Sequence, residues 1–301
     1  MPFRTHFGML FFTALFLFYP GQTPLWDYLS HRPELLTAQA ESVVPEIKPI
    51  PLKPKTGPSI TAEGAYVVDY ESFTPLFARN KDTRFLPAST TKIITALVAE
   101  ELFETDEIIK VNKVYNEGQV MGLIQGERIT VENLLYGILV HSGNDAAYAL
   151  ADAYGYERFI SRMNAKAADL GMSNSHFRNP HGLDESGQYS SPFDLAIAGR
   201  AVLHNKELRK MVHTKEITIS DEDFRVFHRL SNVNQLLGEI QGVGGLKTGY
   251  TEAAGQNLVS FYRRPDGKQF IIVVLKSQDR FQDTREIISW LQGVRYFSVS
   301  P

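Results

Sequence analysis

The sequence predicts an α/β protein in which a β-sheet lobe is divided, along the chain, by an inserted helical lobe. Segments with strand character lie at residues 65–79 and again at 244–275, whereas residues from about 102 to 213 have mostly helical patterning. Because strands at both ends enclose helices, the strand segments are expected to join into one sheet. At 301 residues the chain can bury a large core, in one domain or in two closely joined lobes.

The composition is that of an ordinary globular protein, with 22% charged and 43% hydrophobic residues. The formal net charge of −3 gives no electrostatic reason to expect a nucleic-acid partner. The absence of cysteine excludes disulfides, thiolate catalysis and cysteine-ligated zinc. His141 and His181 are candidates for a metal site, but the eight histidines lack paired metal-ligand spacing, so neither a metal nor another cofactor is predicted.

Residues 1–20 have the pattern of an export signal. Arg4 and His6 precede an uncharged apolar run over residues 7–19, which is too short for a comfortable membrane span. An A-x-A sequence at residues 38–40 lies far downstream and leaves the cleavage site open. The protein is therefore expected to be exported, to the periplasm or the extracytoplasmic face of the cell membrane. An uncleaved N-terminal anchor in contact with the membrane is the alternative.

Residues 21–58 are predicted to form a proline-rich linker. Seven prolines fall within this stretch, with lysines between them. Proline at this density disfavours hydrogen-bonded ladders and favours an extended, fairly stiff spacer. The folded domain, residues 59–301, is therefore expected to begin near Ser59.

The first elements of this domain are predicted to be a β-hairpin and a buried helix. Residues 65–70 and 76–79 have strand patterning around a short turn. Pro87 and small residues then precede an apolar helix over residues 93–99, and a helix that is apolar all round is buried on all sides. Ser89 is therefore expected at the start of a central helix, where backbone N–H groups and the helix dipole favour developing negative charge.

The remaining elements follow from periodicity and from start and turn signals. Helices are predicted at residues 131–140, 145–154, 156–170 and 192–205, with Ser190-Ser191-Pro192 as the start signal of the last. Strands are predicted at residues 216–219, 244–251, 257–263 and 269–275. The turn Pro265-Asp266-Gly267 separates the last two strands, and an amphipathic helix is predicted from about residue 283 to 296.

Three short motifs supply the candidate catalytic residues. Lys92 follows Ser89 by three residues, so both lie on one helix face and the amine can reach the hydroxyl. A Ser-Gly-Asn triplet at residues 142–144 and a Lys-Thr-Gly triplet at residues 247–249 come later in the chain. Each motif alone is weak, since S-x-x-K is expected about once by chance in a chain of this length. In this order, with the first at a buried helix start and the last on a strand, they indicate a serine nucleophile beside a lysine base.

The motifs resemble those of the low-molecular-weight penicillin-binding proteins of the D-alanyl-D-alanine carboxypeptidase type. The resemblance runs from about residue 65 to 297 and includes the stretches at residues 85–92, 179–184, 232–237 and 245–251. It implies the β-lactamase-like, transpeptidase-like fold, in which helices flank an antiparallel sheet and an all-helical lobe is inserted.

The resemblance also implies catalytic roles. Ser89 attacks the carbonyl of the terminal D-Ala-D-Ala bond and forms an acyl-enzyme, and Lys92 accepts its proton. Lys92 can do so only as a neutral amine, which requires burial and a nearby cation, for which Lys247 is the candidate. Ser142 relays a proton to the leaving amine, and Asn144 holds Lys92 and the substrate amide.

The remaining site residues are implied to bind the substrate. Thr248 and Gly249 lie on a strand edge to which the peptide adds by main-chain hydrogen bonds. The backbone N–H groups of Ser89 and Tyr250 form the oxyanion hole. Arg280, together with Thr248 and Lys247, is the candidate that holds the substrate carboxylate.

The expected function is that of a serine-type D-Ala-D-Ala carboxypeptidase, which trims peptidoglycan stem peptides and is inhibited covalently by β-lactams. A D,D-endopeptidase of the same family stays open, because the chain ends soon after its terminal helix without a further β domain. A β-lactamase is disfavoured because no E-x-x-L-N stretch with a deacylating glutamate lies between Ser142 and Lys247. A non-catalytic wall-binding module is disfavoured because every motif residue is present.

Overall fold

The structure is a computed structural model, and it describes residues 50–297. All of these residues belong to one compact unit, Lys48–Pro301. The predicted export signal and most of the predicted linker lie outside the described residues. Among residues 50–297, no helix combines the length and apolar character that crossing a membrane requires.

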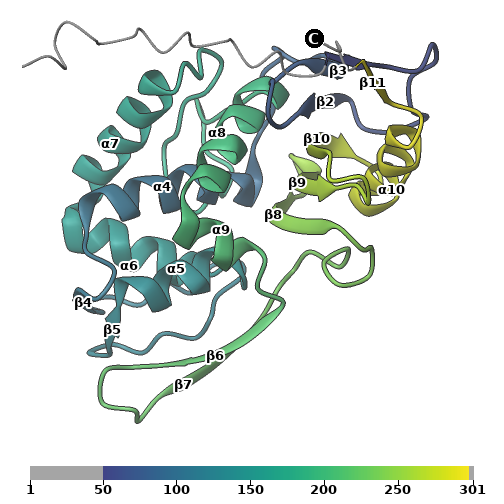
Figure 1. Cartoon of the computed structure of the whole chain (residues 1–301). Coiled ribbons are helices and arrows are strands. Elements are labelled where there is room, and N and C mark those ends of the chain that lie inside the picture. The colour runs from purple at the N-terminus through teal and green to yellow at the C-terminus, as the bar shows by residue number, and fades with distance from the viewer. Residues whose placement is uncertain (1–49, 298–301) are drawn as a thin grey trace, which may run out of the picture. The chain divides into compact units, whose positions relative to one another are not determined.

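A five-stranded antiparallel sheet organises this unit, with the strand order β3-β2-β10-β9-β8 (Figure 1). Its strands are β2 (Gly64–Asp69), β3 (Pro75–Arg79), β8 (Val243–Thr251), β9 (Gly255–Arg263) and β10 (Gln269–Ser277). The pairing of β2 with β10 joins the beginning of the domain to its end, as the sequence predicts. The predicted antiparallel sheet, built from strands at both ends of the domain, is therefore confirmed, and β8 is left as an edge strand beside the helices.

The sheet is buried on both faces because its strands carry apolar residues at successive positions. In β2, Tyr66 and Val68 belong to the core shared with the helices, whereas Ala65 and Val67 belong to a second core on the other face. This alternation is the two-residue period of a pleated strand. Helix α8 (Pro192–His204) packs on one face and α10 (Arg280–Leu291) on the other, and Figure 1 shows them on opposite sides of the sheet.

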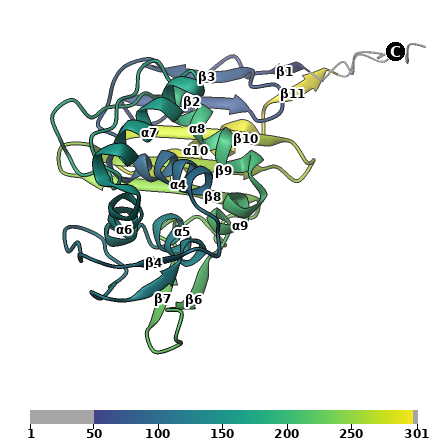
Figure 2. The same cartoon turned by 90° about the vertical axis from the view of Figure 1, so that its left-hand side faces the viewer.

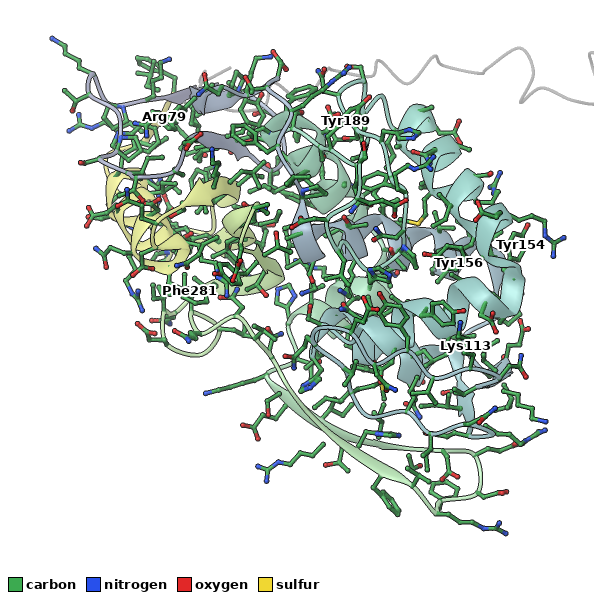
Figure 3. All side chains as sticks on the ribbon, turned by 180° about the vertical axis from the view of Figure 1, so that it is seen from behind. Arg79, Lys113, Tyr154, Tyr156, Tyr189 and Phe281 are labelled. Atoms are coloured by element: carbon green, nitrogen blue, oxygen red, sulfur yellow. The ribbon has the colours of Figure 1, made fainter. Side chains whose placement is uncertain are left out.

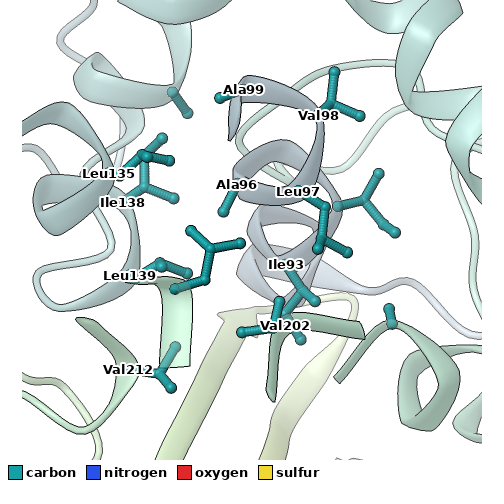
Figure 4. Close-up of a cluster of buried hydrophobic side chains, with 14 of the residues drawn as sticks. Ile93, Ala96, Leu97, Val98, Ala99, Leu135, Ile138, Leu139, Val202 and Val212 are labelled. Atoms are coloured by element: carbon teal, nitrogen blue, oxygen red, sulfur yellow. The ribbon is translucent and has the colours of Figure 1, made fainter. Parts of the chain in front are cut away.

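The helix that follows the candidate nucleophile is central to the helical lobe. Ser89 lies in a short 3₁₀ turn, η1 (Ala88–Thr91), and α4 (Lys92–Leu102) continues from it. Every residue of α4 from Lys92 to Ala99 is buried, in agreement with the predicted buried helix. Figure 4 shows Ala96 of α4 on the side of Leu135, Ile138 and Leu139, and Ile93 on the side of Val202. The helices packed around α4 are α5 (Val131–Leu139), α6 (Asn144–Tyr154), α7 (Tyr156–Asp169) and α8, whereas α9 (Lys206–Val212) packs on α5 and α8.

Two segments of the inserted region differ from the predicted pattern. Residues between α4 and α5 hold no helix but a short hairpin, β4 (Ile108–Lys110) with β5 (Arg128–Thr130). The strand predicted at residues 216–219 is present as β6 (Glu216–Ser220), but it pairs with β7 (Phe227–Ser231) in a separate ribbon. Figures 1 and 2 show this ribbon running away from the central sheet. Local patterning predicts strands but does not specify the sheet that each strand joins.

The two ends of the domain also differ from the prediction. Helix α10 begins at Arg280 rather than at residue 283, because the Asp279 carboxylate caps the N–H groups of Phe281 and Gln282. It ends at Leu291, and the chain continues into β11 (Arg295–Phe297), which pairs with β1 (Ile50–Leu52). Regular structure therefore begins before the predicted boundary at residue 59. Proline is tolerated in β1 because this two-stranded ribbon leaves an unpaired edge on each strand.

Candidate active site

A cleft of about 260 Å³ opens between the edge strand β8 and the helical lobe. It brings together six residues that the sequence singles out, although they are far apart along the chain: Ser89, Ser142, Thr248, Gly249, Tyr250 and Arg280. Gln119 and Val233 complete the lining and were not predicted. The other three candidates, Lys92, Asn144 and Lys247, are buried against these residues, with 0%, 2% and 2% exposure. The structure thus gathers all nine candidates in one place.

The candidate base contacts the candidate nucleophile directly. Lys92 Nζ lies 3.0 Å from Ser89 Oγ, 2.6 Å from Asn144 Oδ1 and 2.6 Å from the backbone oxygen of His181. The last two partners can only accept hydrogen bonds. A neutral amine has two N–H donors and one lone pair, so these two acceptors occupy both donors and direct the lone pair towards Ser89 Oγ. The contacts therefore orient Lys92 to accept the serine proton.

The environment favours the neutral form of Lys92. Burial lowers the pKa of Lys92 well below its ordinary value, and the positive charge of Lys247 lowers it further. The carboxylate of Asp145 opposes this shift to a smaller degree. Burial, together with the charge of Arg280, also lowers the pKa of Lys247, to about 7. The arrangement of the two buried lysines thus makes the Lys92 ammonium lose its proton readily.

Ser142 accepts a hydrogen bond from Lys247. Lys247 Nζ donates to Ser142 Oγ at 2.8 Å and to the backbone oxygen of Thr248 at 3.0 Å. Because the Ser142 oxygen accepts from the ammonium, its own hydroxyl proton is left to be donated into the cleft. Ser142 is 4% exposed and lines the cleft. This geometry suits a proton relay to a leaving nitrogen.

The backbone before Ser89 adopts an uncommon conformation. Ala88 has φ = 48°, in the left-handed region that residues other than glycine rarely occupy. Asn257 Nδ2 holds this segment by donating to the backbone oxygens of Leu86, at 2.9 Å, and Pro87, at 3.2 Å. Gly182 packs against it so closely that a Cβ there would lie 1.9 Å from the Ala88 oxygen. The turn that presents Ser89 is thus held by two segments distant in sequence.

Close backbone approach also explains Gly249. A Cβ at this position would lie 3.0 Å from the Pro87 oxygen and 3.1 Å from the Ser89 nitrogen, so β8 runs directly beside the nucleophile turn. Arg280 reaches the same strand from α10, and its Nη1 donates to the Gly249 oxygen at 2.8 Å. The guanidinium carbon lies 4.9 Å from the ring centroid of Phe281, which Figure 3 labels. Arg280 Nε has no hydrogen-bond partner among the described residues.

The two histidines considered for a metal site have other contacts. The Nε2 atom of His141 lies 2.9 Å from Gln119 Nε2. The ring of His181 stacks on Tyr115 with centroids 4.8 Å apart, and its Nδ1 accepts from the Leu183 N–H at 3.3 Å. Burial lowers the pKa of His181 to about 3, so the ring is neutral. His181 contributes its backbone oxygen, rather than its ring, to the lysine.

Asp145 is a site residue that the sequence reasoning missed. Its buried carboxylate accepts the N–H groups of Met121, at 2.9 Å, Gly122, at 2.9 Å, and Leu123, at 3.0 Å. The same loop supplies Gln119 to the cleft. The signal in the sequence is an acid directly after the Ser-Gly-Asn triplet, but its position by itself predicts only the start of a helix.

We expect Asp145→Asn to weaken both the fold and the site. The amide keeps one acceptor oxygen but places an NH₂ group against backbone N–H donors, which should lower the free energy of unfolding by about 1–3 kcal/mol. Displacement of the loop should reduce kcat/KM by about tenfold or more. Denaturant unfolding and steady-state kinetics measure the two effects. Asp152→Asn, on the same helix α6, is the matched control, and equal effects of both changes would contradict the role of Asp145.

The comparisons with known proteins agree with this geometry. The sequence profile of the D-alanyl-D-alanine carboxypeptidase family matches residues 52–279. D-alanyl-D-alanine carboxypeptidase DacC of Escherichia coli (strain K12) is 34% identical over 265 residues, covering 81% of this chain and 64% of that protein. D-alanyl-D-alanine carboxypeptidase of Streptomyces sp. (strain K15) is 34% identical over 258 residues, covering 78% of this chain and 88% of that protein.

Solved structures give the same result. The crystal structure of the Streptomyces K15 DD-transpeptidase matches with a TM-score of 0.73 and 34% identity, covering 78% of this chain and 98% of that chain. The chain spans only 64% and 66% of the lengths of two Escherichia coli relatives, DacC and DacD. The family match nevertheless covers most of the described domain, including all three motifs. The chain is therefore a member of the D-alanyl-D-alanine carboxypeptidase family.

Proposed function

We propose that this protein is a serine-type D-Ala-D-Ala carboxypeptidase that trims peptidoglycan stem peptides, and that β-lactams inhibit it by acylating Ser89. The observation that carries the proposal is the buried Lys92 amine, 3.0 Å from Ser89 Oγ and flanked by the Lys247 cation. The names of the relatives, which are D-alanyl-D-alanine carboxypeptidases, support the same reaction.

The first half of the reaction is acylation. Lys92 Nζ takes the proton of Ser89 as Oγ bonds to the carbonyl carbon of the penultimate D-alanine. Negative charge develops on the carbonyl oxygen, and we assign its stabilisation to the backbone N–H groups of Ser89 and Tyr250; losing one such donor typically costs about a hundredfold or more in rate. The C–N bond then breaks and free D-alanine leaves. Ser142 donates its hydroxyl proton to the departing nitrogen and is reprotonated from the Lys92 ammonium.

The substrate is positioned by the edge of the sheet. Strand β8 has β9 as its only sheet neighbour among the described strands, so its outer edge is available for an extended peptide. The terminal carboxylate would then lie near Lys247, Thr248 and Arg280. The Arg280 Nε donor without a protein partner supports this assignment, because a buried donor is normally satisfied.

The second half of the reaction separates the candidate activities. Water attacking the Ser89 ester gives a carboxypeptidase, whereas an amine acceptor gives a transpeptidase. The structural relative from Streptomyces K15 is named a DD-transpeptidase, which makes transfer the second candidate. A D,D-endopeptidase would differ in accepting cross-linked peptides, and a β-lactamase would hydrolyse the penicilloyl ester rapidly.

One experiment distinguishes these activities. The protein is incubated with a pentapeptide ending in D-Ala-D-Ala, with and without glycylglycine as acceptor, and the products are identified by mass spectrometry. We expect release of D-alanine and a tetrapeptide, with stable labelling of Ser89 by penicillin. Absence of both D-alanine release and labelling would overturn the proposal. Cleavage restricted to cross-linked muropeptides, or rapid penicillin turnover, would select one of the alternatives.

The two lysines give the reaction a bell-shaped pH dependence. Activity should rise as Lys92 loses its proton and fall above about pH 7, where Lys247 loses the charge that binds the carboxylate. We therefore expect kcat/KM for the pentapeptide to decrease on the alkaline side. The C-terminal amide of the same peptide lacks the carboxylate and should lose most of this alkaline limb. Identical alkaline limbs for the two substrates would contradict the role of the Lys247 charge in binding the carboxylate.

The substrate also implies a location. Because peptidoglycan lies outside the cell membrane, the enzyme would act in the periplasm or at the extracytoplasmic face. The apolar run at residues 7–19 supports export, either as a signal or as an anchor that contacts the membrane. Fractionation of cells that produce the full chain, with N-terminal sequencing of the mature protein, tests both statements. Retention in the cytoplasm with an intact N-terminus would contradict them.

A further inference from the structure

A second hollow, here called the basic hollow, lies apart from the catalytic cleft. Its volume is about 510 Å³, roughly twice that of the cleft, and the two share no lining residue. Helix α9, the start of β8 and the end of β9 form its walls. Its lining contains two lysines, two arginines and one histidine but no aspartate or glutamate. The catalytic mechanism uses none of these side chains.

Three of its four cations come from one face of a helix. Lys206, Arg209, Lys210 and His213 follow each other at the i, i+3, i+4 and i+7 spacing, which places them on the same side of α9. Like charges at this spacing repel each other. Lys206 also stands in the first turn, where the helix dipole disfavours a cation. Helix stability therefore does not account for this arrangement.

The fourth cation reaches the hollow from the sheet. Arg263 ends β9 and lines the hollow together with Gly242, whose oxygen accepts the Arg263 backbone N–H at 2.7 Å. None of the four cations forms an ion pair with a carboxylate of residues 50–297. Elsewhere on the surface arginines do pair, for example Arg285 with Glu239. In a chain of net charge −3, the hollow is thus a local concentration of uncompensated positive charge.

The floor of the hollow depends on a glycine. A Cβ on Gly244 would lie 2.4 Å from His213 Nε2 and 2.6 Å from Phe261 Cδ1, so any side chain there would displace the floor. The β8–β9 ladder shifts register between Val243 and Leu246, as expected where a bulge redirects a strand. The Arg209 guanidinium carbon lies 5.8 Å from the Phe261 ring centroid. Backbone and side chains together keep the cationic groups around an open space.

The histidine on this floor can add a further donor. Its Nδ1 lies 2.6 Å from the Arg209 backbone oxygen, which can only accept, so Nδ1 carries the proton. The Nε2 atom then carries a lone pair and accepts hydrogen bonds in the neutral ring, and it becomes a donor in the protonated ring. Burial and the nearby Arg209 charge lower the pKa of His213, and a bound anion would reverse that effect by favouring the charged form.

We propose that the basic hollow binds an anion that carries phosphate groups. Two guanidinium groups offer paired donors that match phosphate oxygens, and two ammonium groups add charge. A multiply charged phosphate compensates four cations better than a single carboxylate does. Two sources share this chemistry, namely a soluble phosphate compound and the headgroup of a phospholipid. The site is independent of the proposed peptidase reaction, since it shares no residue with the catalytic cleft.

Titration calorimetry of the full chain with inorganic pyrophosphate at low salt tests the proposal. We expect saturable binding that Arg209→Gln combined with Arg263→Gln weakens by at least about tenfold. The matched control combines Arg225→Gln with Arg229→Gln, which removes the same charge from the β6–β7 ribbon and should leave the affinity unchanged. Equal thermal unfolding midpoints exclude a folding defect. No saturable binding to wild type, or equal weakening by both double variants, would overturn the proposal.

A vesicle measurement identifies the source of the phosphate. The full chain is sedimented with vesicles of phosphatidylcholine alone and with equal amounts of phosphatidylglycerol and phosphatidylcholine, so that any effect of the apolar N-terminus appears in both. A lipid site predicts extra binding to the mixed vesicles that the Arg209/Arg263 variant loses. Pyrophosphate binding without this extra binding identifies a soluble ligand. D-alanine release by this variant should equal that of wild type, which separates this test from that of the peptidase.

Discussion

Ser89→Ala should abolish labelling by penicillin and reduce release of D-alanine by at least about 10⁴-fold. The change removes the only oxygen that lies beside the Lys92 amine on this turn, so no acyl-enzyme can form. Intact-protein mass spectrometry after exposure to penicillin measures the labelling, and pre-steady-state release of D-alanine measures the reaction. Because Ser89 is only half-buried, the fold should tolerate the alanine.

Two comparisons make this prediction decisive. Ser161→Ala changes an exposed serine on α7 that belongs to no motif and does not line the cleft, and it should leave both the labelling and the release of D-alanine at the wild-type level. The Ser89 variant should still bind the peptide non-covalently, because the β8 edge and Lys247 are unchanged. Penicillin labelling that persists in Ser89→Ala would show that another residue is the nucleophile and would contradict the proposed mechanism.

Lys92→Met should slow acylation by about 10³-fold while leaving peptide binding largely intact. Methionine fills a similar volume but offers no lone pair to accept the serine proton. The loss should appear in kcat and in the rate of penicillin labelling, whereas KM should change little. Stopped-flow acylation with a fluorescent penicillin provides the measurement. Acylation within tenfold of wild type would show that another group takes the proton.

The interpretation of this variant requires a check on folding. Removal of the Lys92 amine leaves Asn144 Oδ1 and the His181 backbone oxygen without their buried donor, which should cost about 1–3 kcal/mol of unfolding free energy. Lys110→Met, at the exposed end of strand β4, is the matched control for loss of a lysine. If the Lys92 variant is unfolded at the assay temperature, acylation is measured at a lower temperature, at which both the variant and the wild type are folded.

Much of the fold could be predicted from local patterning. The alternation of apolar residues in β2 and β10 and the unbroken apolar run of α4 follow from where each side chain is buried. The start signal Ser190-Ser191-Pro192 correctly predicts the first residue of α8. The pairing of β1 with β11, by contrast, joins two three-residue strands, which are too short to produce a period.

The candidate residues of the site could also be chosen from sequence, because chemistry restricts which residue types act as nucleophile, base and anion binder. Their supporting residues could not. Patterning predicts Asn257 only as part of a strand, yet its side chain holds the turn before Ser89 by hydrogen bonds to residues 170 and 171 positions away. Asp145 and the loop at residues 121–123 form a similar pair. Such contacts leave no local periodicity, so only the folded chain reveals them.

The order of the motifs, the buried helix behind the nucleophile and the α/β class were therefore determined by the amino-acid sequence alone. The protonation state of Lys92 was decided by tertiary structure, since it depends on acceptors 52 and 89 residues away and on the charge of Lys247 from the sheet edge. Burial and electrostatic fields arise from atoms that meet only after folding. For that reason a serine and a lysine three residues apart become a reactive pair in this fold, whereas the same spacing elsewhere remains an ordinary helix surface.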